Sequence, residues 1–187
     1  MIVKASAEGL LQQVKGQKGP PPVHLWNPPF CGDIDIRIAR DGTWFYLGTP
    51  IGRAPLVKLF SSILKREEGE YFLVTPVEKV RIRVDDAPLL AVDFIATGEG
   101  RDQVLRFVTK TEDEVEADAD HPITCTFRGE EPAPYIHVRR GLNALIDRKS
   151  FYRLCELGCH EVQNGESWFG LWSHGRFMPL IPSARLP

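Results

Sequence analysis

The sequence lacks the features that mark several large classes of protein. Its four cysteines among 187 residues are too few for a disulfide scaffold. No apolar run approaches the ~20 residues that a membrane helix needs, and the first eleven residues are broken by charged residues and glycine, unlike a secretory signal. We therefore expect a cytoplasmic protein with reduced thiols and no membrane partner.

An excess of charge of one sign is also missing. The 23 Lys and Arg residues stand against 25 Asp and Glu residues, which gives a net charge of -2 at pH 7. The chain therefore has no global positive field to bind nucleic acid, and we expect no nucleic-acid partner. The sequence does not indicate an oligomeric state.

Strong catalytic signatures are absent as well. The chain has no P-loop and no G-x-S-x-G, H-E-x-x-H or C-x-x-C motif. Cys155, Cys159 and His160 are close in sequence, but a tetrahedral zinc site needs a fourth ligand and the usual second pair is missing. We predict no catalytic residues, no metal ligands and no identifiable cofactor.

The composition, with 43% hydrophobic and 26% charged residues, is that of a globular α+β protein. Ser6 is positioned to cap a short helix, which ends in the Gly- and Pro-rich linker before Val23. Isoleucines that alternate with polar residues over 34–38, together with the aromatic run 44–47, predict a hairpin. Apolar residues over 55–64 have the spacing of a helix, which we expect to stop before Gly69. We therefore expect a helix and linker over 1–22 and a hairpin-plus-helix domain over 23–75.

A second domain, 76–187, is expected to begin near Thr75-Pro76, where proline interrupts an extended segment. Period-two patterning predicts an antiparallel meander that curls into a bent sheet or partial barrel, followed by a closing helix over 148–157 and a final hairpin. The predicted strands with this period are 71–74, just before the boundary, and 79–84, 89–96, 103–108, 123–127 and 135–139 after it. A faint repeat relates the strand, helix and aromatic segments of the two halves.

The loop His24–Gly32 places an imidazole, an indole, an amide and a thiol between prolines. It is interpreted either as a binding loop, in which Trp26 stacks on a planar ligand and Asn27 reads its edge, or as an aromatic plug over the hairpin core. Cys31, activated by His24, is an alternative nucleophile, although a lone cysteine more often behaves as a small buried hydrophobe.

Three basic residues and a threonine complete the candidate ligand site. Thr49 and Arg53 lead into the predicted helix, where an anion would meet free N–H groups; the alternative is that Arg53 pairs with a carboxylate such as Asp33 or Asp35. Lys79 and Arg81 lie on one face of a predicted strand, a pattern that usually marks a solvated face and otherwise a ligand contact.

Several motifs resemble those of an uncharacterised bacterial family, domain of unknown function 1285. They are Trp26-Asn27-Pro28, Cys31-Gly32-Asp33-Ile34-Asp35-Ile36, Asp41-Gly42-Thr43-Trp44, Gly48-Thr49-Pro50-Ile51 and, at the end, Trp172-Ser173-x-Gly175-x-Phe177-x-Pro179-Leu180. The resemblance implies a two-part fold with a repeated motif and a second part like a pleckstrin-homology barrel. It also implies a nucleotide-type ligand at the interface of the parts and a role in signalling, but it supplies no catalytic residues.

Three functional hypotheses follow. The leading one is a ligand-sensing module in which Trp26 and Asn27 hold a planar group while Arg53 with Lys79 or Arg81 holds an anionic tail. The second is a thiol enzyme or redox sensor centred on Cys31. The third is a protein-interaction domain without a small ligand, using a sheet edge or an aromatic patch of Trp168, Phe169 and Trp172.

Overall fold

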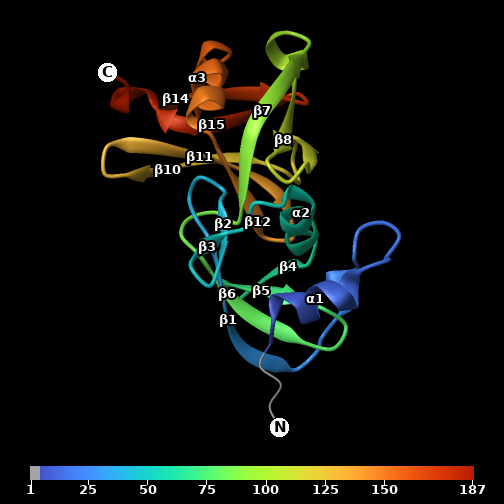
Figure 1. The fold of residues 1–187 in the computed structure, drawn as a ribbon. Coiled ribbons are helices and arrows are strands. Elements are labelled where there is room, and N and C mark those ends of the chain that lie inside the picture. The colour runs from blue at the N-terminus through green and yellow to red at the C-terminus, as the bar shows by residue number, and fades with distance from the viewer. Residues whose placement is uncertain (1–4) are drawn as a thin grey trace. The chain divides into compact units, whose positions relative to one another are not determined.

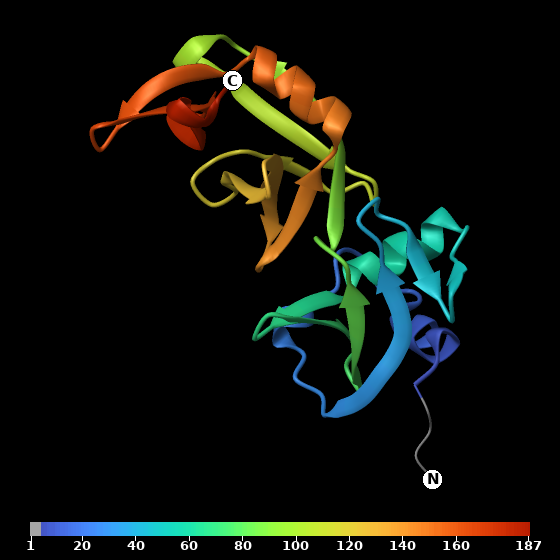
Figure 2. The same cartoon turned by 90° about the vertical axis from the view of Figure 1, so that its left-hand side faces the viewer.

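The computed structural model describes residues 5–187, which form two compact units divided between Pro88 and Leu89. Figures 1 and 2 show that strands make up most of both units, with few helices, so the α+β prediction is confirmed. Within the described residues, no helix has the length and apolar character required to span a bilayer.

The first unit is built on a six-stranded sheet. Its elements are α1 (Ala7–Val14), the 3-10 turn η1 (Val23–Leu25), β1 (Phe30–Ile38), β2 (Trp44–Tyr46), β3 (Thr49–Pro50), α2 (Ala54–Ser62), β4 (Leu64–Glu67), β5 (Glu70–Val74) and β6 (Lys79–Val84). The predicted N-terminal helix and the hairpin of β1 and β2 are confirmed. The Ser6 side chain caps α1 by accepting a hydrogen bond from the backbone N–H of Gly9 at 3.1 Å.

The sheet order is β3-β2-β1-β6-β5-β4, and β1 pairs with β6 in parallel. Figure 2 shows these two strands side by side, with β1 bent where the pairing register shifts. The predicted antiparallel meander is therefore confirmed for β5 and β6 but is wrong after β6, which pairs with β1 and not with residues 89–96. The chain leaves the sheet through α2 after β3 and returns at the opposite edge as β4, so strands distant in sequence meet at the centre.

The buried face of this sheet carries the core of the unit. Ile34, Ile36 and Ile38 point inward from β1, and α2 adds Phe60, whose ring is stacked on that of Trp44 with centroids 6.2 Å apart. The helix ends at Ser62, earlier than the predicted stop before Gly69, because Leu64 already pairs with Leu73 as the first residue of β4. Core and helix together leave the opposite face of the sheet to solvent.

The second unit holds a six-stranded and a three-stranded sheet. Its elements are β7 (Leu89–Thr97), the 3-10 turn η2 (Gly100–Asp102), β8 (Val104–Thr109), β9 (Glu114–Glu116), β10 (Ile123–Arg128), β11 (Glu131–Arg139), β12 (Leu142–Ile146), α3 (Arg148–Glu156), β13 (Cys159–Gln163), β14 (Glu166–Ser173), β15 (Arg176–Pro182) and the 3-10 turn η3 (Ser183–Arg185). The closing helix and the final hairpin of β14 and β15 are confirmed, whereas β9, β12 and β13 were not predicted.

The larger sheet of this unit has the order β10-β11-β12-β7-β8-β9, with β12 and β7 parallel. Figure 1 shows α3 beside β7, and Phe151 and Leu154 of α3 are buried. Counted from its first strand, each six-stranded sheet has the order third, second, first, sixth, fifth, fourth. Two three-stranded meanders joined by a parallel pair therefore form the frame of both units.

The predicted domain boundary near Thr75-Pro76 falls inside the first sheet. Strand β5 before it pairs with β6 after it, and β6 also pairs with β1. Residues 76–88 therefore belong to the first unit, and the proline marks a turn between neighbouring strands.

Candidate ligand-binding site

The solvent face of the first sheet is polar because its central strands alternate. On β6, Val80 and Ile82 are buried in the core, while Lys79, Arg81 and Arg83 point to the other side. On β1, Asp33 and Asp35 alternate in the same way with buried isoleucines. Because β1 and β6 are hydrogen-bonded neighbours, this face presents acids and bases side by side.

Arg81 is held by carboxylates from both neighbouring strands. Its Nε and Nη2 donate to the two carboxylate oxygens of Asp33 on β1, at 2.7 and 3.1 Å, and its Nη1 donates to Glu70 on β5 at 2.9 Å. The hydrogen bond from Arg81 lowers the pKa of Asp33. The guanidinium is thereby fixed in one orientation on the open face of the sheet.

A second group of ion pairs lies next to it. Lys79 Nζ and Lys65 Nζ contact the two carboxylate oxygens of Glu67 at 2.7 and 2.9 Å, and these hydrogen bonds lower the pKa of Glu67. Lys65 Nζ also donates to the carbonyl oxygen of Trp26 at 3.2 Å. The Trp26 loop is therefore tied to the strand face through Lys65.

These side chains surround a hollow of about 500 Å³, lined by Phe30, Glu67, Glu68, Glu70, Phe72, Lys79 and Arg81. The Phe30 ring is 52% exposed and meets Phe72 edge to face, with centroids 6.1 Å apart. Lys79 lies over Phe72 at 5.0 Å and Arg81 over Phe30 at 5.8 Å. The hollow thus combines an exposed ring with cations and carboxylates.

Of the seven predicted site residues, Lys79 and Arg81 line the hollow directly. Trp26 and Asn27 belong to the loop beside it and Cys31 to the start of β1, because Phe30 is in the lining and the Lys79 N–H donates to the Pro29 carbonyl at 3.2 Å. Cys31 is exposed, and its Sγ donates to the Pro29 carbonyl at 3.3 Å.

Thr49 and Arg53 are not brought to the hollow. Thr49 lies on β3, at the sheet edge opposite β4, and Arg53 follows it as the exposed N-cap residue of α2. The alternative pairing of Arg53 with Asp33 or Asp35 is also not formed, because those carboxylates bind Arg81 and Arg83.

Five lining residues were not predicted as site residues: Phe30, Glu67, Glu68, Glu70 and Phe72. Phe30 lies on β1 and Glu70 and Phe72 lie on β5, which are the two neighbours of β6. Glu67 lies on β4, beyond β5, and Glu68 lies in the turn between β4 and β5. The outward positions of the three strands would have revealed their residues once the strand order was known. Alternation along one strand shows which side chains share a face, but it does not show which strands are neighbours.

The proposed aromatic patch of the second unit is only half exposed. Phe169 packs edge to face on His160, and Trp172 packs on Phe177 beneath the Arg101 guanidinium, 4.9 Å from the ring centroid. Trp168 is half-buried too. These rings therefore contribute to the packing of the small sheet.

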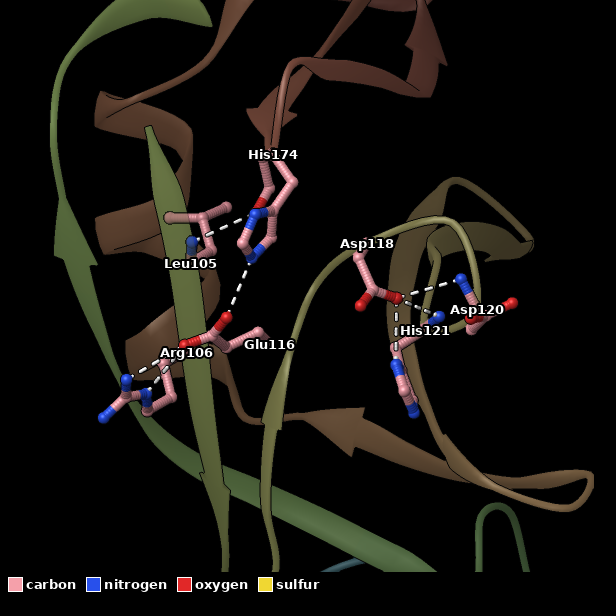
Figure 3. Close-up of polar contacts among 8 residues, drawn as sticks. Leu105, Arg106, Glu116, Asp118, Asp120, His121 and His174 are labelled. Carbon is pink, nitrogen blue, oxygen red and sulfur yellow. Dashed lines mark hydrogen bonds and ion pairs between the residues drawn. The ribbon is translucent and has the colours of Figure 1, made fainter. Parts of the chain in front are cut away.

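The acidic run of residues 112–120 in the second unit is engaged in contacts with basic residues. Figure 3 shows Glu116 between Arg106 and His174, with 2.9 Å to Arg106 Nη2 and 2.8 Å to His174 Nε2. Asp118 accepts hydrogen bonds from the His121 ring and backbone. In residues 5–187, no set of three or more His, Cys, Asp or Glu side chains is grouped as a metal site.

Comparison with protein-family models identifies the family. Residues 21–87 match the N-terminal domain of DUF1285, a domain of unknown function, and residues 88–180 match the C-terminal domain of the same family. The chain belongs to the DUF1285 family. The boundary between the two matched domains lies within one residue of the division between the two structural units.

Two solved DUF1285 structures are similar to this chain. A family protein from Silicibacter pomeroyi DSS-3 is 61% identical, with a TM-score of 0.86 over 96% of this chain and 98% of that one. A family protein from Shewanella baltica OS155 is 36% identical, with a TM-score of 0.51 over 63% of this chain and 87% of that one. No functionally curated protein matches the sequence.

Proposed function

We propose that this DUF1285 protein is a ligand-sensing module of signal transduction that binds a nucleotide-type ligand in the hollow of its first unit. The observation that carries the proposal is the combination of the exposed Phe30 ring with Lys79 and Arg81 in a concavity of about 500 Å³. Ligand sites of small molecules are concave, and a few placed polar groups orient the ligand.

The anionic part of the ligand is proposed to bind Arg81 and Lys79. Both side chains are paired with carboxylates. Partly exposed ion pairs contribute only about 0 to 1 kcal/mol to stability, so a phosphate can displace the carboxylates at small cost. The planar guanidinium offers two parallel donors to phosphate oxygens, as it does to Asp33. Ligand binding would thereby release Asp33, Glu70 or Glu67, which gives the module a signal to transmit.

The planar part is proposed to stack on Phe30, with Trp26 and Asn27 of the adjoining loop closing over it. The carboxylate of Glu68 makes no hydrogen bond or ion pair with residues 5–187, and it is available to accept from an amino group of the ligand ring. A nucleotide carries ring donors and an anionic tail, which matches a lining of mixed sign.

Two features of the fold support the wider proposal. The bent sheet of the second unit, with α3 against it, supports the expected likeness to a pleckstrin-homology-like barrel. The strand order common to the two sheets supports a repeated motif, although it pairs different elements from those matched in the sequence.

The test is a thermal-shift screen of the full chain against mono-, di- and cyclic nucleotides. A ligand at about 100 times its dissociation constant adds roughly 2.7 kcal/mol to the native state, which is easily detected. Hydrogen exchange with a stabilising nucleotide should then show protection in residues 65–82. A flat panel, or protection confined to the second unit, would contradict the proposal and favour a protein-interaction domain.

A further inference from the structure

A second hollow, of about 390 Å³, adjoins the hollow of the first unit that contains Phe30. The two hollows share Glu70 and Arg81, so the Arg81 side chain borders both. The rest of the second lining comes from β1 and β6, which lie side by side in Figure 2, and consists of Asp33, Ile34, Asp35, Ile82 and Arg83. A ligand held by Arg81 can therefore extend from the first hollow into the second.

Arg83 is the cation that distinguishes the second hollow from the first. It lies two residues after Arg81 on β6, so the two side chains leave the same face of the sheet and their Cα atoms are about 6.6 Å apart. Arg83 Nη2 donates to Asp35 Oδ1 at 2.8 Å, and within residues 5–187 the guanidinium binds no other acceptor. Its side chain is 69% exposed. Most of its N–H donors are therefore open to a ligand.

The carboxylates that line the second hollow are all paired with arginine. Asp33 and Glu70 bind Arg81, and Asp35 binds Arg83. The pair of Asp35 and Arg83 is exposed, so it contributes little to stability. A phosphate carries more negative charge than a carboxylate and fits the planar guanidinium with two oxygens. It can therefore replace Asp35 on Arg83.

We propose that the ligand of the first unit is a nucleotide with two separate phosphate groups, one bound by Lys79 and Arg81 and the other bound by Arg83 in the second hollow. This inference rests on the proposed function and adds the chemical class of the ligand. Phosphates on the 3′ and 5′ oxygens of one ribose are separated by about the spacing of Arg81 and Arg83, whereas the phosphates of a 5′-diphosphate are much closer together. A nucleoside 3′,5′-bisphosphate therefore fits the row of cations along β6.

The test compares three compounds in calorimetric titrations of the full chain: the 5′-monophosphate, the 5′-diphosphate and the 3′,5′-bisphosphate of each of adenosine, guanosine, cytidine and uridine. We expect the bisphosphate to bind at least tenfold more tightly than the monophosphate of the same nucleoside, as one more charge-assisted contact predicts. The diphosphate controls for charge, because it carries the same number of phosphates in one place. It should bind more weakly than the bisphosphate.

Substitution of Arg83 separates the two phosphate positions. In Arg83→Ala the bisphosphate should lose its advantage, whereas the affinity for the monophosphate, which reaches only the first hollow, should be unchanged. Asp35→Asn removes the competing carboxylate, so it should tighten the bisphosphate about two- to fivefold and leave the monophosphate unaffected. Arg53→Ala is the control, because it removes the same charge from a residue that lines neither hollow.

Two results would overturn this inference and leave the proposed function intact. One is equal affinity for the bisphosphate and the monophosphate in every nucleoside series that binds. The other is an advantage of the bisphosphate that persists in Arg83→Ala. Binding of none of the compounds would contradict the proposed function, and with it the inference.

Discussion

At the scale of single residues, Glu67 is the carboxylate that competes most directly with the proposed anion. It is held between Lys65 and Lys79, and the hydrogen bonds from Lys79 and Lys65 lower its pKa. Replacing it with glutamine removes the competing charge while keeping the volume of the side chain. The ion pair between Glu67 and Lys79 in the unliganded protein therefore lowers the affinity for the proposed anion.

We accordingly expect Glu67→Gln to tighten nucleotide binding by about two- to fivefold, the scale of a partly exposed ion pair. Calorimetric titration measures the change. Asp35→Asn is the matched control, since it frees Arg83, which lies beyond the lining of the hollow, and should leave affinity unchanged. Weaker binding by the Glu67→Gln variant would argue against an anion at Lys79.

A second prediction at this scale concerns acid stability. The hydrogen bonds from His174 and Arg106 lower the pKa of Glu116; for Asp118, burial raises the pKa, but the bonds from His121 and the backbone outweigh it. A carboxyl with a lowered folded-state pKa stabilises the protein above its unfolded value and loses this contribution as pH falls through the folded value.

The urea midpoint should therefore be steady near neutral pH and fall as the pH drops below about 4.5, the ordinary value for glutamate. In Glu116→Gln the fall should be shallower, because one of the titrating groups is gone. A midpoint that stays constant from pH 5 to pH 3 would contradict the role given to these pairs.

The residues of the candidate site were only partly predictable from the sequence. Lys79 and Arg81 follow from alternation along one strand, and Trp26 from an unusual loop. Arg53 was predicted as a site residue because it precedes a helix. It follows β3, however, and β3 and β4 are opposite edges of the sheet. Sequence spacing cannot show which edge a loop reaches.

At the scale of elements, the pairing of β14 with β15 depends on Gly170. A Cβ at this position would overlap the Met178 carbonyl oxygen and the Phe177 ring on the neighbouring strand. The two strands approach each other too closely here for any side chain, so only glycine fits at this position.

Gly170→Ala should therefore lower the free energy of unfolding by about 1 to 3 kcal/mol, the usual cost of overpacking. Denaturant unfolding measures it. Gly52→Ala provides the control, because a Cβ there meets no atom within 4 Å and its backbone is not in the left-handed region. Equal stability of the two variants would show that β14 and β15 separate easily.

The elements themselves were largely predictable, whereas their pairing was not. Hydrophobic periodicity predicted α1, α2, α3 and most strands, because it reports which face of each element is buried. Strand β12, Leu142–Ile146, was missed because four of its five residues are buried and it shows no alternation. The two parallel pairs require long returns of the chain, which no local pattern records.

At the scale of the whole molecule, the chain consists of two units that share one strand order and belong to one family. The predicted domain boundary lies earlier in the sequence than the observed division after Pro88, because the proline that follows β5 resembles a linker residue. Whether a segment joins the preceding sheet depends on pairing with β1, which lies more than forty residues earlier.

The central claim for the molecule is that the hollow of the first unit binds a nucleotide through Arg81. The most direct test compares the affinity of Arg81→Ala and Arg83→Ala for the nucleotide that gives the largest thermal shift. Both arginines lie on β6 and are paired with aspartates of β1, but only Arg81 lines the hollow. We predict a loss of about tenfold or more for Arg81→Ala, equivalent to about 1.4 kcal/mol, and no change for Arg83→Ala or Arg53→Ala. Unchanged affinity in Arg81→Ala, or a loss confined to Arg53→Ala, would contradict the account.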